Sequence, residues 1–306
     1  MRITDKVLND NFLRNLSRNL NQVSKYQNQL SSGKIVSRPS DDPLLVAKIM
    51  SMDINISQNQ QYNNNITASL GWVKTQDTAL ADATSTLQRI KDLIIYGSNG
   101  TLSDIDRQAI VAEVKMKADE LSDILNTNFD GRYIFAGQMT TTKPFTRGED
   151  GAIIYNGDDK DISREISQGV EIPLLTAGNR LLMAEGIDET NENRDLGVLL
   201  KNVIAALEAG DSETLSGEDG LLGFMEEHVD NVVRVRTQIG AIHNRLEAAE
   251  ERNKAENMNL KEILSQREDV DIAEKYMEYL LVANTYQASL SIGARILQPS
   301  LLDYLR

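Results

Sequence analysis

The chain has 306 residues, no cysteine and a formal net charge of −14, with 46 acidic against 32 basic side chains. This acidic balance argues against a nucleic-acid partner, because proteins that bind phosphate backbones carry a basic face. The absence of cysteine excludes disulfides, thiol chemistry and thiolate metal sites. No run approaches the roughly 20 apolar residues of a membrane span, so we expect no membrane partner.

The charge is unevenly distributed along the chain. Residues 1–36 carry six Lys/Arg and two Asp/Glu, residues 271–306 carry three and four, and the residues between them therefore carry −17. Like-charged bodies repel, so tight self-association would use the chain ends as contact surfaces. The N-terminal stretch MRITDKVLNDNFLRNL is too polar for the core of a secretory signal, which taken alone favours the cytoplasm.

The first predicted helix carries apolar residues at alternating spacings of three and four. Its seam, the stripe of residues expected to face another helix, consists of Leu13, Leu16, Leu20, Val23, Gln27 and Leu30. Sustained heptads of this kind predict long helices packed side by side.

The next stretch, SSGKIVSRPSDDP at residues 31–43, predicts a corner between two helices. Gly33 can take the left-handed conformation that closes a helix, and Pro39 pushes Arg38 out of the helical region. Ser40 or Asp42 can cap the following helix, with Pro43 in its first turn.

The heptad pattern resumes from Ile49 to Ile94 and returns from Met225 to Ile263. A capping box at Ser103 starts another helix that ends near Asn126. After REDVD the register shifts, and the last helix has the seam Ala273, Tyr276, Leu280, Ala283, Gln287, Leu290, Ala294 and Leu297.

Between the helical halves, GRYIFAG, GAIIYNGDD and GVEIPLL predict short strands in a small β-rich insertion over residues 132–185. A short helix follows from Asp195 to Ala209 and is closed by Gly210. The predicted fold class is therefore mainly α, with long helices in a coiled-coil or bundle rod built from both chain ends and one small inserted β-rich domain.

We divide the chain into three expected domains. Residues 1–36 with 271–306 form a terminal coiled-coil domain, residues 37–131 with 186–270 form a helical rod, and residues 132–185 form the outer β-rich domain. The apolar seams of the terminal segments lack enough local partners, so we expect these segments to be disordered in the free monomer.

No motif in the sequence predicts catalysis, and we expect neither an enzyme nor a cofactor or metal site. His228 and His243 lack partners of ligand character at suitable spacing, which favours packing or solvent roles. The stretch NGDDKD lacks the glycine and closing glutamate of a calcium loop. Nucleophile elbows, phosphate loops and H-E-x-x-H are missing from the sequence.

The last helix differs from an ordinary surface helix. Arg295 is the only charged residue between Glu278 and Asp303, in a stretch dominated by Ala, Ser, Leu, Gln and Gly. This composition favours a surface that becomes buried between subunits. A core helix of the same monomer is the alternative.

Motifs at both chain ends resemble those of the flagellins and their hook-associated relatives. The resemblance is carried by LSSGK, RPSDDP and GRYIFAG in the N-terminal half and by REDVDIAEKYMEY and ILQPSLLDYLR in the C-terminal part. Within the family, SRPSDDP, NGTLSDIDRQAI and FDGRYIFAG are more similar to the member at the hook–filament junction than to flagellin.

The resemblance implies a structural adaptor with two faces that match two helical lattices. Implied partners are the first hook-associated protein, flagellin, further copies in a ring, and an export chaperone that binds the C-terminal helix. The implied location is the extracellular flagellum, reached through the flagellar type III channel without a cleaved signal. The corner residues, from Gly33 to Pro43, would join the inner tube to the outer rod.

The resemblance also implies that the first and last helices run antiparallel, and the matched heptad spacing permits this. Paired residue numbers should then sum to roughly 304, uncertain by about a turn of 3.6 residues. Leu16 would lie opposite residues 287–290 and Leu20 opposite residues 283–287. A minor flagellin that polymerises in the filament and a secreted coiled-coil adhesin remain the alternative functions.

Overall fold

The computed structural model describes residues 5–99, 102–148, 152–184, 186–188, 190–217 and 220–296. It is mainly helical with a small β-rich region, which confirms the predicted fold class. The long helices are α1 (Asp5–Ser32), α2 (Pro43–Gly97), α3 (Asp104–Leu125), α7 (Leu221–Glu268) and α8 (Ile272–Ile296). None of the described helices is long and apolar enough to cross a membrane.

The shorter elements lie between α3 and α7 in the sequence. The helical ones are α4 (Asn179–Leu182), the 3-10 turn η1 (Glu192–Arg194), α5 (Leu196–Ala209) and α6 (Ser212–Ser216). The strands are β1 (Asn128–Phe129), β2 (Arg132–Tyr133), β3 (Phe145–Arg147), β4 (Ile153–Tyr155), β5 (Ser163–Ser167) and β6 (Val170–Pro173). Within the described residues they pair as three antiparallel two-stranded sheets, β1–β2, β3–β4 and β5–β6.

Local capping signals in the sequence fix several helix ends. The Ser103 hydroxyl accepts a hydrogen bond from the Asp106 N–H, 3.2 Å away, at the start of α3. The Asp195 carboxylate accepts one from the Gly197 N–H at 2.7 Å, and Gly210 ends α5 with φ of 73°. These contacts satisfy backbone groups that a helix terminus leaves without partners, so both predicted helices are confirmed.

The chain divides into two compact units, and α2 and α7 contribute residues to both. The first unit consists of residues 1–58 and 255–306, and the second of residues 59–254. The boundaries at 132–185 and at residues 36 and 271 that the sequence suggested remain predictions.

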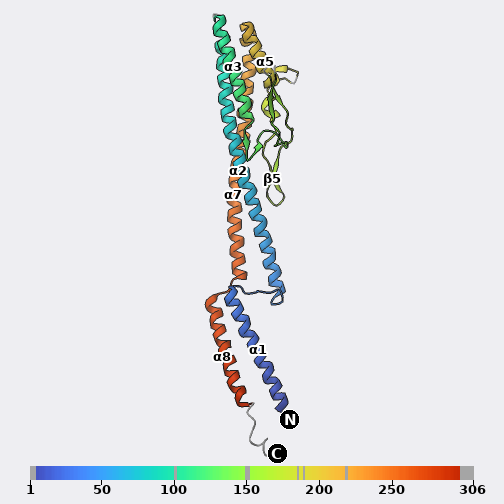
Figure 1. Cartoon of the computed structure of the whole chain (residues 1–306), viewed down its shortest axis with the longest axis vertical. Helices are drawn as coiled ribbons and strands as arrows, with labels where there is room; N and C mark the ends of the chain where they lie inside the picture. The colour runs from blue at the N-terminus through green and yellow to red at the C-terminus, as the bar shows by residue number, and fades with distance from the viewer. Residues whose placement is uncertain are drawn as a thin grey trace, which may run out of the picture. The chain divides into compact units, whose positions relative to one another are not determined.

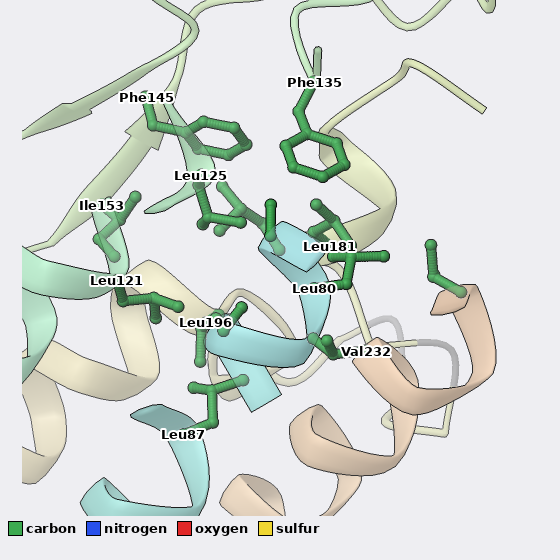
Figure 2. Close-up of a cluster of buried hydrophobic side chains, with 14 of the residues drawn as sticks. Leu80, Leu87, Leu121, Leu125, Phe135, Phe145, Ile153, Leu181, Leu196 and Val232 are labelled. Atoms are coloured by element: carbon green, nitrogen blue, oxygen red, sulfur yellow. The ribbon is translucent and has the colours of Figure 1, made fainter. Parts of the chain in front are cut away.

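The second unit contains a continuous hydrophobic core that joins the helices to the β-rich segment. Figure 2 shows side chains from α2, α3, α5 and the strands directed toward one another. The labelled members of this core are Leu80, Leu87, Leu121, Leu125, Phe135, Phe145, Ile153, Leu181, Leu196 and Val232. Each retains at most 2% of its accessible surface, so the strands contribute to the same core that holds the helices together.

The first unit has almost no core of its own. Among its described residues, only Ile49 and Val270 are buried hydrophobic side chains. Since burial of apolar surface is the main favourable contribution to folding, this unit gains little stability from internal packing.

Candidate assembly interface

The two chain ends form one helical pair, in which α1 and α8 lie side by side (Figure 1). The Asn19 amide donates to the Ser289 hydroxyl at 3.3 Å, and the Lys275 ammonium lies 5.7 Å from the centre of the Tyr26 ring. These pairs have residue numbers that sum to 308 and 301. The predicted antiparallel pairing near 304 is therefore confirmed.

The paired face of α1 differs in part from the predicted seam. Leu16, Val23 and Leu30 are half-buried as expected. Leu13 and Leu20, by contrast, remain 55% and 48% exposed. The half-buried residues that follow the heptad on α1 are Phe12, Leu16, Asn19, Val23, Tyr26 and Leu30.

On α8 the prediction selected a neighbouring face of the helix. Leu280 and Leu290 are 42% and 43% exposed, and Gln287 and Ala294 are also exposed, whereas Ala283 is half-buried. The heptad face turned toward α1 consists of Lys275, Tyr279, Val282, Tyr286, Ser289 and Gly293. Leu297 lies outside the described residues. Leu20 and Gln287 are both exposed in this structure, so the placement of Leu20 opposite residues 283–287 stays a prediction for the assembled state.

A close approach of α1 and α8 at Gly293 explains which face of α8 packs against α1. Gly293 is buried, and a Cβ atom there would lie 2.2 Å from the Phe12 ring. Glycine thus leaves room for an aromatic side chain of α1. Aromatic residues two heptads apart, Phe12 and Tyr26, and one heptad apart, Tyr279 and Tyr286, were the sequence signal that could have identified this face.

The outer surface of the pair is rich in large apolar side chains. Their exposed fractions range from 42% to 69%. On α1 they are Val7, Leu13 and Leu20, and on α8 they are Ile272, Tyr276, Met277, Leu280, Leu281, Leu290 and Ile292. We call these ten residues the outer apolar face. Exposed apolar surface is typical of interaction sites when its side chains gather in one patch.

The corner after α1 is tied to the segment that precedes α8. Gly33 adopts φ of 71°, and its carbonyl oxygen accepts from the Val270 N–H at 2.9 Å. The Ile35 N–H donates to the Glu268 carbonyl at 2.7 Å, and the Lys34 side chain pairs with the Glu268 carboxylate. That hydrogen bond raises the pKa of Lys34. A short antiparallel bridge thus holds both connections together.

The remainder of the corner starts α2. The Asp42 carboxylate accepts from the N–H groups of Leu44 and Leu45 at 3.1 and 3.0 Å, so Asp42 is the cap and Pro43 is the first helical residue. Ser40 does not carry the cap. The Arg38 N–H donates to the Asp41 carboxylate at 3.2 Å, while Arg38, Pro39 and Ser40 are all exposed. The local geometry agrees with the corner prediction; its role as a hinge or spoke remains a proposal.

The two histidines occupy structural positions. His228 is fully buried, and its Nε2 lies 3.0 Å from the Asn193 carbonyl oxygen. Burial lowers the pKa of His228, so the neutral ring is favoured. His243 is half-buried, 3.7 Å from the Glu247 carboxylate. Among the described residues, no group of three or more His, Asp or Glu side chains could hold a metal ion.

A helical pair built from both chain ends, with apolar side chains on its outer face, is the arrangement of a helical structural protein. Family models support this class at both ends of the sequence. The bacterial flagellin N-terminal helical region matches residues 3–140, and the bacterial flagellin C-terminal helical region matches residues 222–305. The chain belongs to the flagellin family.

Individual relatives refine this assignment. The chain is 28% identical to flagellar hook-associated protein 3 of Escherichia coli over 304 residues, covering 94% of this chain and 95% of the relative. It is 26% identical to flagellin of Bacillus subtilis, with 91% and 90% covered. The crystal structure of the flagellar junction protein FlgL from Legionella pneumophila has the same fold. It matches with a TM-score of 0.58 and 16% identity, covering 74% of this chain and all of that chain.

Proposed function

We propose that this protein is a structural adaptor of the bacterial flagellum that forms the junction between the hook and the flagellin filament. The observation that carries the proposal is the outer apolar face on a helical pair made from both chain ends. The similarity to flagellar hook-associated protein 3 along nearly the whole chain supports the same role.

Burial of the outer apolar face supplies the driving force for assembly. Fully burying one large apolar side chain contributes about 1.5–3 kcal/mol, and these side chains have roughly half of their surface still to bury. Each residue then adds about 1 kcal/mol, so several acting together hold a subunit in place against the entropy lost on association.

The proposed partners are the first hook-associated protein on one side, flagellin on the other, and further copies of this chain in a ring. An export chaperone would bind the C-terminal helix before assembly, when the outer apolar face is uncovered. Export would proceed through the flagellar type III channel without a cleaved signal. The corner from Gly33 to Pro43 would connect the inner tube to the outer part of the subunit.

We further propose that α1 and α8 become ordered on assembly. The support is the near absence of buried apolar side chains in the unit that contains them. Hydrogen exchange on dilute monomer should show rapid exchange in both helices. Strong protection of both helices in the monomer would contradict this part of the proposal.

The junction role is tested in a strain that lacks this protein. Wild-type protein should restore filament attachment and should be located by immunogold labelling at the hook–filament boundary. Leu290→Asp, which charges the outer apolar face, should abolish attachment. Val170→Asp, at a 40% exposed position on β6, is the matched control and should restore it. Labelling along the whole filament would overturn the junction assignment.

A minor flagellin is the second candidate, because flagellin of Bacillus subtilis is also similar over 91% of the chain. The two candidates differ in how far assembly proceeds. A junction protein should not elongate by itself, whereas a minor flagellin should form long filaments from purified protein. Electron microscopy of concentrated protein with short filament seeds distinguishes them.

A further inference from the structure

A small cavity lies beside the only tryptophan of the chain. Its volume is about 120 Å³, enough for a group of a few non-hydrogen atoms. It is lined by one turn of α2, the β1–β2 turn, strand β5 and Leu174, and it opens to solvent. Its lining residues include Trp72, Phe129, Asp130, Arg132 and Arg164.

The tryptophan side chain presents a polar group without a partner. Trp72 retains only 6% of its accessible surface and packs edge-on against Phe129, with ring centres 6.0 Å apart. Its indole N–H has no hydrogen-bond acceptor among the described residues. A buried donor without an acceptor is unfavourable, and buried tryptophans usually find one. The residue in the cavity wall thus carries an indole N–H without an acceptor.

Two arginines on the cavity wall are also without partners. Neither Arg132 nor Arg164 forms an ion pair or hydrogen bond through its side chain with any described residue. Other arginines of the same unit are paired, such as Arg89 with Glu113 at 2.6 Å and Arg236 with Asp77 at 2.8 Å. Two guanidinium groups without partners therefore lie on the wall of one cavity.

The remaining charged group at the cavity does not neutralise these arginines. Asp130 occupies the β1–β2 turn with φ of 53° and is exposed. Its carboxylate forms no ion pair with Arg132 or Arg164 in the described structure. The cavity thus combines a buried neutral donor, two free cations and an aromatic wall.

We propose that this cavity binds a carboxylate group. A guanidinium fork matches the two oxygens of a carboxylate, and the indole N–H of Trp72 provides a further donor. The volume admits a carboxylate with one or two attached carbons, which the ring of Phe129 can contact. The group can belong to a small free acid or to an acidic side chain of another protein chain.

The tryptophan supplies a specific probe for this site. The full chain, labelled with ¹⁵N, has a single indole N–H resonance because Trp72 is its only tryptophan. Titration with acetate should shift this resonance downfield in a saturable manner, with half of the shift reached at about 1 mM acetate. Sodium chloride at the same ionic strength should not. A shift that is absent, unsaturable or equal in chloride would overturn the proposal.

Substitutions at the cavity should act in opposite directions. Arg164→Gln and Arg132→Gln should each weaken acetate binding about tenfold, since each removes a charge-assisted hydrogen bond. Asp130→Asn removes a competing negative charge and should tighten acetate binding. Arg252→Gln makes the same charge change at an exposed position of α7 that does not line the cavity, and it should leave acetate binding unchanged. Equal weakening by Arg252→Gln would show a general effect of charge and would contradict the proposal.

Two further titrations identify the ligand class and its source. Inorganic phosphate should bind more weakly than acetate, and binding of phosphate alone would refute the carboxylate assignment. A short Glu-rich peptide and its Gln counterpart then separate the sources. Tighter binding of the Glu peptide than of acetate indicates an acidic segment of another chain, whereas equal binding indicates a free acid. The circular dichroism of each variant confirms that the helices remain folded.

Discussion

Strand β4 offers a direct test of whether the β-rich segment shares its core with the helices. Ile153 and Ile154 are neighbours with the same side chain on opposite faces of the strand, and they are 2% and 49% exposed. Ile153 belongs to the core formed with Leu121 and Leu196 (Figure 2). Ile153→Ala should therefore destabilise the helices, whereas Ile154→Ala should have little effect.

The magnitude follows from burial. Truncating a fully buried isoleucine to alanine costs about 2–5 kcal/mol, because transfer free energy is lost and a cavity remains. For a unit of this size the thermal midpoint falls by about 2–4 °C per kcal/mol, so Ile153→Ala should lower it by roughly 4–20 °C. Substitution at the exposed position should change the free energy of unfolding by no more than about 0.5 kcal/mol.

Thermal unfolding followed by circular dichroism at the helix signal measures both variants. Since the strands contribute almost nothing to that signal, a lower midpoint in Ile153→Ala reports loss of helix stability. If the two variants have the same midpoint as the wild type, the β-rich segment is energetically separate, and replacing residues 132–185 by a linker should leave the helices intact.

The other predictions concern the helical pair, one glycine and one histidine. In assembled flagella, Asn19→Cys with Ser289→Cys should form a disulfide under oxidation, whereas Asn19→Cys with Leu281→Cys, on the 69% exposed face, should not; the reverse result would refute the pairing. Gly240→Ala should raise the free energy of unfolding by about 0.5–1 kcal/mol, because a Cβ there meets no atom within 4 Å of this helix-interior position, and a lower midpoint would show a hidden contact. Burial lowers the pKa of His228, so the unfolded chain binds a proton first as the pH falls. Stability should therefore decrease as the pH drops from neutral through the unfolded pKa of about 6.5, and a His228→Gln variant should lose this dependence. An unchanged dependence in that variant would assign it to other groups.

Local signals made much of the fold predictable from the sequence. Asp42 with Pro43 and Asp195 with Gly210 are capping chemistry that acts within a few residues, so their positions follow from the chain alone. The antiparallel direction of α1 and α8 followed from the family resemblance. The level at which they meet was predictable, because the corner after Leu30 is expected to lie beside the turn before Ala273.

The face used by α8 could not be derived from spacing. This helix carries apolar residues on several sides, so Tyr279 with Val282 and Leu280 with Leu290 both fit helical periodicity. The choice depends on Gly293 accepting the Phe12 ring, a contact between residues far apart in the sequence. The cavity at Trp72 could not be predicted from the sequence either, because its walls come from three segments that are far apart in the chain.

The unequal distribution of core between the two units relates stability to assembly. The second unit contains an extensive buried apolar core, whereas the first has ten large apolar side chains on the outer apolar face and buries only Ile49 and Val270 among its described hydrophobic residues. A segment that lacks internal burial gains its folding free energy from whatever covers it, so folding and binding become one equilibrium. Additional internal burial would stabilise the monomer, yet it would remove apolar area from the surface that neighbouring subunits must cover. On the proposed function, the weak core of the first unit is the physical condition under which its helices remain open to partners before assembly and become stable within it.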